Sequence, residues 1–185
     1  MGLYASPEGR NYPDGTMVVR EYVIMNKQPL ECHPSGCWAR PLSNGAWLHP
    51  LEAALRLHNE TGLVTIVDLH RWNETAPAQF WAKIPSETPW YDEYLSVLRD
   101  EYVPFCQAWG ASVWLSIWNE PFMWDGSDGV DAAQWASEMG SILAVVRSAG
   151  YTGIVVVPVG RMGQDESVAV AEGATLAATH GPLGA

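Results

Sequence analysis

The stretch ASVWLSIWNEP, residues 111 to 121, joins an apolar run to a polar motif and decides the predicted fold. Its first seven residues, 111–117, are apolar enough to form a buried strand. An ionised carboxylate at the end of such a strand, here Glu120, is costly to bury unless it has a partner or a function. The stretch therefore indicates a fold that places functional side chains at the ends of buried strands.

The rest of the chain alternates between apolar runs and helical patterns. Further strands are predicted at residues 16–24, 63–69 and 153–159, and the run at 63–69 is apolar on both faces, as in a sheet covered on both sides. Apolar residues recur at helical spacing in the segments between them, and Pro104 predicts a kink in one of these helices. Strands that alternate with helices indicate parallel βα units.

Two parallel architectures compete for this pattern. A doubly wound sheet usually binds a nucleotide through a Gly-rich first turn, and the chain contains neither that motif nor a phosphate-binding loop. A βα barrel places catalytic side chains at the carboxyl ends of several strands. Polar residues accompany the four predicted strands: Arg20 lies within or near the end of the first, His70 follows the second, Asn119 and Glu120 follow the third, and Arg161 follows the fourth. The pattern therefore favours an α/β fold of the (β/α)8 TIM-barrel type.

Strand spacing bounds how much of a barrel the chain holds. The predicted strands lie about 45 residues apart, so that eight such units need roughly 360 residues, whereas the chain has 185 residues. We therefore expect a single domain over residues 1–185 that forms an incomplete catalytic barrel.

Composition excludes several classes of partner. The chain has 10 Lys and Arg against 21 Asp and Glu, a net charge of -11, which argues against nucleic acid. A run of about 18 apolar residues, the minimum for a membrane span, does not occur. The N-terminus lacks the basic and apolar regions of a signal peptide, so the expected secretion signal of the parent protein is not in this chain.

Two of the three cysteines allow more than one interpretation. Cys32 and Cys37 lie five positions apart in a loop that contains Pro and Gly, where they form either a disulfide, favoured in an oxidising compartment, or free thiols. The segment 31–37 also holds His33, but three potential ligands without a fourth make a poor metal site. The sequence predicts neither a metal nor a cofactor.

The motif at residues 118–121 suits the cleavage of glycosidic bonds. That reaction needs one carboxyl group to protonate the leaving oxygen and a second to attack or to activate water. Glu120 would be the proton donor, its pKa raised by apolar neighbours such as Trp118, and Asn119 would bind the sugar 2-hydroxyl. The chain also has ten Trp, whose flat rings suit sugars. The structural alternative is an Asn-Glu-Pro turn at the start of a helix.

Three motifs together resemble glycoside hydrolase family 5, the cellulases and mannanases with (β/α)8 barrels. They are VVRE (18–21), VDLH (67–70) and WNEP (118–121), and the similarity runs from about residue 16 to 164, over strands two to five of such a barrel. The resemblance implies a catalytic acid/base at Glu120 and substrate-binding roles for Asn119, His70 and Arg20. The family usually continues VVR with Ile-Pro, whereas Glu21 and Tyr22 follow here.

Other interpretations of these residues stay open. His70 also fits a histidine bonded to a backbone carbonyl, and Arg20 also fits an ion pair with Glu21 or Asp68. The side chains of Trp72 and Trp124, which follow His70 and Glu120, are candidate sugar-stacking platforms or core residues.

The resemblance also implies a second catalytic residue, a nucleophilic glutamate at the end of strand seven. Glu138, Glu166 and Glu172 follow Glu120, and none has the required spacing and strand context. The parent enzyme is therefore expected to hydrolyse β-linked polysaccharides as a retaining endo-β-glucanase or endo-β-mannanase, whereas this chain alone is expected to be inactive. The alternatives are a carbohydrate-binding half-barrel without catalysis and a unit whose open sheet edges drive self-assembly.

Overall fold

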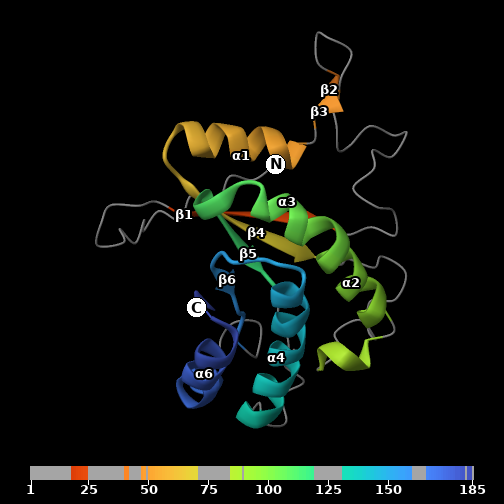
Figure 1. Ribbon diagram of the computed structural model, residues 1–185, viewed down its shortest axis with the longest axis vertical. Helices are drawn as coiled ribbons and strands as arrows, with labels where there is room; N and C mark the ends of the chain where they lie inside the picture. Colours follow the sequence, from red (N-terminus) through yellow and green to blue (C-terminus); the bar gives the residue numbers. More distant parts are fainter. Residues whose placement is uncertain are drawn as a thin grey trace.

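Five parallel strands form the central sheet of the computed structural model. The structure describes residues 18–24, 40–41, 47–48, 50–70, 84–88, 90–118, 131–159, 166–181 and 183–184. In spatial order the strands are β1 (Val18–Ile24), β4 (Val64–His70), β5 (Val113–Ser116), β6 (Val155–Val156) and β7 (Leu183–Gly184). A separate antiparallel pair consists of β2 (Arg40–Pro41) and β3 (Trp47–Leu48) (Figure 1).

The order of the strands distinguishes between the two architectures. Neighbouring strands of the central sheet are also consecutive along the chain, once the separate pair β2 and β3 is set aside. All four neighbouring pairs are parallel. A doubly wound sheet reverses this order at a switch point, and the described strands contain no such reversal. Because parallel crossovers are right-handed, steps in one direction keep the connecting helices on one face. The prediction of an α/β fold with the winding of a βα barrel is confirmed.

Helices occupy the connections between the strands. They are α1 (Pro50–Glu60), α2 (Tyr91–Val97), α3 (Val103–Gln107), α4 (Ala132–Ser148) and α6 (Ser167–His180). Helix α4 has the firmest start, because the Asp131 carboxylate accepts hydrogen bonds from the amides of Ala133 (2.8 Å) and Gln134 (3.1 Å). Gly150, with φ of 92°, follows its last turn in the left-handed conformation that suits glycine.

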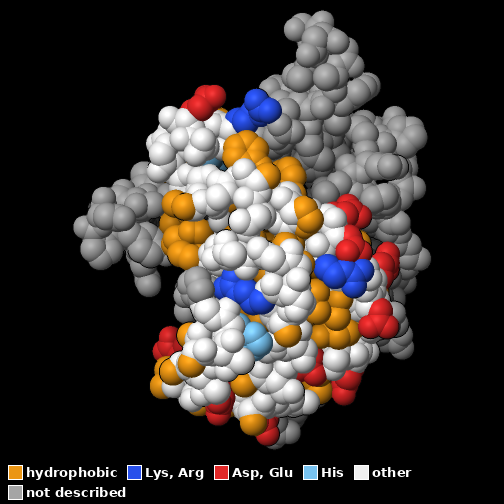
Figure 2. Space-filling view, viewed as in Figure 1, with side chains coloured by type: hydrophobic (Ala, Val, Ile, Leu, Met, Phe, Trp, Pro, Cys, Tyr) orange, Lys and Arg blue, Asp and Glu red, His pale blue; other side chains and the backbone are white. Residues whose placement is uncertain are grey.

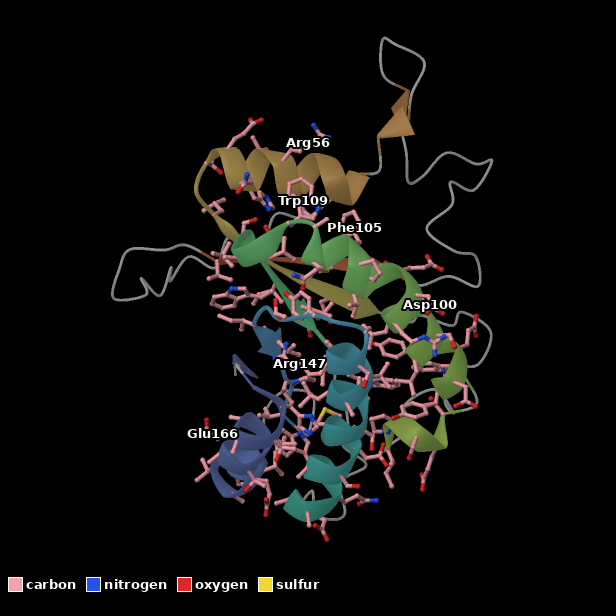
Figure 3. All side chains as sticks on the ribbon, in the orientation of Figure 1. Arg56, Asp100, Phe105, Trp109, Arg147 and Glu166 are labelled. Atoms are coloured by element: carbon pink, nitrogen blue, oxygen red, sulfur yellow. The ribbon has the colours of Figure 1, made fainter. Side chains whose placement is uncertain are left out.

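The expected kink at Pro104 takes the form of a wider turn. A π-helical turn over Leu98–Tyr102 separates α2 from α3, which begins one residue before Pro104. Proline has no amide hydrogen, and its ring excludes the carbonyl of the residue four positions earlier, so the ordinary helical pattern cannot pass through it. Figure 3 shows Phe105 and Trp109, just beyond this break, on the side of the segment that faces α1.

Alternate residues of the sheet differ in how deeply they are buried. Thr65, Val67, Val113, Leu115 and Val155 are at most 1% exposed. The residues between them along the strands are half-buried: Val64, Ile66, Trp114 and Val156. Since successive side chains of a strand point to opposite faces, one face of the sheet is fully covered and the other is covered in part. The prediction was a sheet covered on both sides; the second face is covered in part at these positions and fully at Asp68.

Polar groups inside the covered face have partners. The buried His58 of α1 shares a 2.8 Å hydrogen bond between its Nδ1 and the Thr65 Oγ1 of β4. This contact gives the His58 Nδ1 and the Thr65 hydroxyl a partner in the interior.

One arginine joins α4, β6 and α6. Arg147 donates from Nη1 to the carbonyls of Tyr151 (2.7 Å) and Gly153 (2.9 Å), and from Nε to the carbonyl of His180. Figure 3 shows Arg147 between these elements. Its guanidinium group also lies 5.9 Å from the centroid of the Tyr151 ring, a distance suited to a cation–π contact. Burial lowers the pKa of Arg147, and burial followed by the nearby Arg147 charge lowers that of His180.

Several elements differ from the sequence-based prediction. The fourth predicted strand is only two residues long, and β2, β3, α6 and β7 were not predicted. Figure 2 shows acidic side chains grouped over α2 and the π-helical turn after it, which together carry Asp92, Glu93, Asp100 and Glu101.

Within the described residues, no helix is long and apolar enough to cross a membrane. Cys32 and Cys37 lie outside those residues.

Candidate active site

The site lies where β4 and β5 end, at the carboxyl edge of the sheet. Asp68 of β4 is paired in register with Ser116 of β5. His70 ends β4 two residues after Asp68, and Trp118 lies two residues after Ser116. Parallel strands end at a common edge, so the backbone of His70 and the start of the WNEP motif are brought to the same edge.

Four of the predicted site residues lie outside the described part of the chain. They are Asn119, Glu120, Trp72 and Trp124. Asn119 and Glu120 follow Trp118 directly in the sequence, so the structure defines the position from which they start.

Arg20 lies within β1 and not at its end. It is paired with Ile66, whereas the last pair of the two strands joins Ile24 to His70. Of the two predicted positions, within the first strand or near its end, the structure shows the first, with Arg20 four residues before the last residue of β1. The usual Ile-Pro of the family would interrupt the ladder, because proline cannot donate a hydrogen bond to it, but Glu21 and Tyr22 continue the strand here.

The peptide group of Ile117, just past β5, has a hydrogen bond on each side. Its amide donates to the carbonyl of Val156 (3.3 Å), and its carbonyl accepts from the Tyr94 Oη of α2 (2.7 Å). Tyr94 is 1% exposed and Ile117 is fully buried. Burial raises the pKa of Tyr94 well above its usual range, and the charge of the buried Asp68 adds to this effect. The hydroxyl is therefore a permanent donor near neutral pH.

Aromatic rings enclose Trp118, the residue directly before Asn119. Its ring stacks on that of Trp90, with centroids 5.1 Å apart and an angle of 9° between the planes. Tyr94 and Tyr91 meet it at tilted angles, with centroids 4.6 Å and 6.1 Å away. Trp118 is 6% exposed as a result. The apolar neighbourhood predicted for the motif is thus present up to its first residue.

Helix α4 holds the turn that leads to Trp90. The Glu138 carboxylate accepts hydrogen bonds from the Ser86 hydroxyl (2.6 Å) and the Ser86 amide (3.0 Å). Burial, and then the Glu138 charge, raises the pKa of nearby Tyr91 to about 12. Glu138 therefore has a structural partner and is not at the end of a strand.

The other glutamates after Glu120 are also on helices. Glu166 is the exposed residue at the start of α6, and Glu172 lies within that helix. None of the three is at the carboxyl end of a described strand. The described residues contain no cluster of three or more side chains suited to a metal ion.

Sequence reasoning missed Trp90, Tyr94 and the Glu138–Ser86 contact. Trp90 and Tyr94 lie four residues apart, on one side of a helical turn, which is a pattern that marks a shared aromatic contact. Nothing in the sequence indicates that this contact is Trp118, which lies 24 positions beyond Tyr94.

The consecutive parallel strands, with helices in their connections, give the described part of the chain the winding of a βα barrel. The family model of the cellulases, glycosyl hydrolase family 5, matches residues 14–177, and the chain belongs to this family.

Solved structures share the fold at low sequence identity. A β-mannanase from Thermomonospora fusca has a TM-score of 0.51 at 21% identity, over 77% of this chain and 46% of that one. The mannohexaose complex of that mannanase gives 0.52 at 21%, over 77% and 47%. A trimodular endoglucanase of subfamily GH5_4 gives 0.54 at 13%, over 90% and 31%. The chain thus spans about half the length of the mannanase. No curated protein sequence matches it.

Proposed function

We propose that this chain carries the acid/base part of a glycoside hydrolase site that acts on β-linked polysaccharides. One observation supports the proposal: the last register pair of β4 and β5, Asp68 with Ser116, lies two residues before His70 on one strand and two residues before Trp118 on the other, and Trp118 directly precedes Asn119 and Glu120. Membership of family 5 supports the reaction type, and the buried aromatic surroundings of Trp118 support a raised pKa for a carboxyl group nearby.

Each residue of the motif has a role in the proposed reaction. Glu120 protonates the leaving glycosidic oxygen and afterwards activates a water, while Asn119 binds the sugar 2-hydroxyl. His70 and Arg20 complete the polar surroundings, Arg20 from within β1. Trp72 and Trp124 stack on sugar rings. No cofactor takes part.

Retention of configuration needs a second carboxyl group about 5 Å from the first. The glutamates that follow Glu120 are on helices, so we place the nucleophile in the remainder of a complete barrel and assign turnover to that barrel. The substrate is a β-mannan or a β-glucan. Mannohexaose bound to the Thermomonospora mannanase supports the first, and the shared fold of the endoglucanase supports the second. Such polymers lie outside the cell, and we therefore propose a secreted parent protein.

The test replaces Glu120 by Gln in the complete barrel that contains this chain. Hydrolysis of substrates with poor leaving groups should fall by about 10² to 10⁴, because protonation of the leaving oxygen is lost. Activated leaving groups need little protonation, so their glycosylation step should be largely spared. Azide should restore the second step, because an anion needs no general base.

Glu172→Gln, on α6, is the matched control and should leave both rates unchanged. If Glu120→Gln also leaves both substrate types unaffected, the proposed role of Glu120 is wrong.

The alternative is carbohydrate binding without catalysis, which the half-buried face of the sheet around Ile66 and Trp114 favours. Oligosaccharide binding by the complete barrel without hydrolysis of either polysaccharide would support this alternative. Association of the chain alone, measured by sedimentation, would instead support self-assembly through sheet edges.

A further inference from the structure

We infer that Tyr94 and Trp90 are positioning residues for Glu120. Tyr94 fixes the backbone at Ile117, and Trp90 fixes the side chain of Trp118, the residue that follows Ile117 as the chain leaves β5. The inference rests on the proposed function of Glu120 and extends it to Trp90, directly before α2, and to Tyr94 within α2.

The first step concerns the backbone at Ile117. Register pairs between β4 and β5 end at Asp68 and Ser116, so the ladder does not fix the next carbonyl along the chain. That carbonyl accepts the Tyr94 hydroxyl, while the Ile117 amide is held by β6. The contact is fully buried, and removal of the hydroxyl would leave the carbonyl without its donor. Tyr94 therefore sets the direction in which the chain leaves the sheet.

The second step concerns the side chain of Trp118. A nearly parallel stack on Trp90 fixes the plane of its ring, and Tyr94 closes one side at a tilt. The carbonyl of Trp118 also lies 3.4 Å from the Ser116 hydroxyl, which donates to it. Both the ring and the backbone of the residue before Asn119 are thus held by side chains of known position.

The third step concerns what holds Trp90. The turn at 84–88 is tied to α4 by Glu138, through Ser86. The amide of Tyr91 donates to the carbonyl of Thr88 (3.1 Å), and the amide of Tyr94 donates to the carbonyl of Trp90 (2.9 Å). The turn at 84–88, Trp90 and α2 therefore form one connected support, and α4 holds this support through the contact of Glu138 with Ser86.

The position of an acid/base matters for two reasons. A displacement of 1 Å can cost about a hundredfold in rate. A carboxyl group that moves from apolar surroundings into water also loses the desolvation that raises its pKa. A positioning role therefore predicts a change in the titration of Glu120 itself, which a general loss of stability in a folded variant does not.

The chain offers a matched control for each residue. Tyr151 Oη donates to the carbonyl of Val113 (2.9 Å), at the opposite end of β5 from Ile117. Trp109 is half-buried, like Trp90, but it precedes the amino end of β5. The variants Tyr151→Phe and Trp109→Leu thus remove comparable groups away from the carboxyl edge.

The experiment follows the side-chain carboxyl carbon of Glu120 by NMR during a pH titration of this chain. The resonance is assigned by its loss in Glu120→Gln, and the folding of each variant is checked by near-ultraviolet circular dichroism. Tyr94→Phe and Trp90→Leu should each lower the titration midpoint of Glu120 by about one pH unit. Tyr151→Phe and Trp109→Leu should leave it in place.

An unchanged midpoint in folded Tyr94→Phe or in folded Trp90→Leu would overturn the inference, as would an equal shift in a control. If one of the two test variants does not fold, the other decides together with its control. The hydrolysis assay of Glu120→Gln separates this result from the proposed function. Shifted midpoints with undiminished hydrolysis contradict only the proposed function, and unchanged midpoints with abolished hydrolysis contradict only the positioning role.

Discussion

Tyr94 and Tyr151 donate hydrogen bonds to the two ends of the same strand. Tyr94 Oη lies 2.7 Å from the carbonyl of Ile117, and Tyr151 Oη lies 2.9 Å from the carbonyl of Val113. The strand between them, β5, has only four residues. Its position therefore depends on two buried hydroxyl groups as well as on its ladders with β4 and β6.

Removal of either hydroxyl should destabilise the chain by a similar amount. Tyr94→Phe and Tyr151→Phe should each lower the free energy of unfolding by about 1–3 kcal/mol, because a buried carbonyl loses its donor. The two carbonyls are about 13 Å apart along an extended strand, so the losses should add in the double variant. Urea denaturation measures all three variants. A loss below about 0.5 kcal/mol in either single variant would show that water replaces the hydroxyl.

Alkaline pH should destabilise the chain through Cys106. Burial raises the pKa of this fully buried thiol from 9.0 to about 12. Between these two values the unfolded state ionises while the folded state stays neutral. The stabilising contribution is therefore complete below pH 9 and is lost as pH rises towards 12. The free energy of unfolding should fall by at most about 1.4 kcal/mol per pH unit for this single group.

The variant Cys106→Ala isolates that contribution. Denaturation of both proteins under reducing conditions at pH 8, 9 and 10 should show a shallower decline in the variant. Tyr91, with its pKa raised to about 12, adds to the decline above pH 10 in both proteins. Identical pH dependence between pH 9 and 10 would contradict the assignment to Cys106.

Loss of the Glu138 carboxylate should release the turn before α2. In Glu138→Ala the Ser86 amide loses its acceptor, and its hydrogen exchange should accelerate at least tenfold, a loss of about 1.4 kcal/mol of local protection. Glu138→Gln keeps one acceptor oxygen and should give a smaller effect. Glu172→Ala, on α6, serves as the control. Unchanged exchange at Ser86 would mean that the contact contributes nothing in solution.

Trp72 or Trp124 should report on sugar binding. If one of these rings stacks on a sugar, titration with manno- or cello-oligosaccharides should quench tryptophan fluorescence, and substitution of that ring by Ala should weaken the quench. Trp109→Ala is the control, because this ring lies before the amino end of β5. A quench that neither Trp72→Ala nor Trp124→Ala alters in folded protein would place the sugar elsewhere.

Long apolar runs made most of the sheet predictable. Strands β1 and β4 each have seven residues; β1 lies within the predicted run 16–24, and β4 ends one residue beyond the predicted run 63–69. Strand β6 was predicted over 153–159 but has only two residues. Pro158 cannot donate to a ladder, and its carbonyl accepts a hydrogen bond from Trp135 Nε1 (3.0 Å) instead.

The sequence pattern after β6 was too weak to predict α6 and β7. Only Val168 and Leu176 of α6 are buried, and two large apolar residues eight positions apart are too few to indicate a helical period. Its alanines would have indicated a helix by intrinsic propensity alone. Strand β7 has two residues, too few for any periodicity.

The motifs predicted part of the site and none of its support. WNEP and VDLH predict Glu120 and His70 beyond apolar strands; the structure places the backbone of His70 at the end of β4, whereas Glu120 lies outside the described residues. Arg20 lies within β1, as the strand predicted over residues 16–24 allows. Trp90 and Tyr94 were not found because their contacts with Trp118 and Ile117 cross from one βα unit to the next.

The sequential order of the central sheet has a consequence for synthesis on the ribosome. Each parallel strand binds to the strand of that sheet made before it, so the template for every new strand is already complete when that strand emerges. Such a chain can grow by addition at one edge, without waiting for a distant partner, and its loops close over one unit at a time. During growth one edge of the described sheet is always the newest strand, and the other edge stays β1. Premature pairing between neighbouring nascent chains is therefore the main hazard of this order, at one edge that is constant and one that moves.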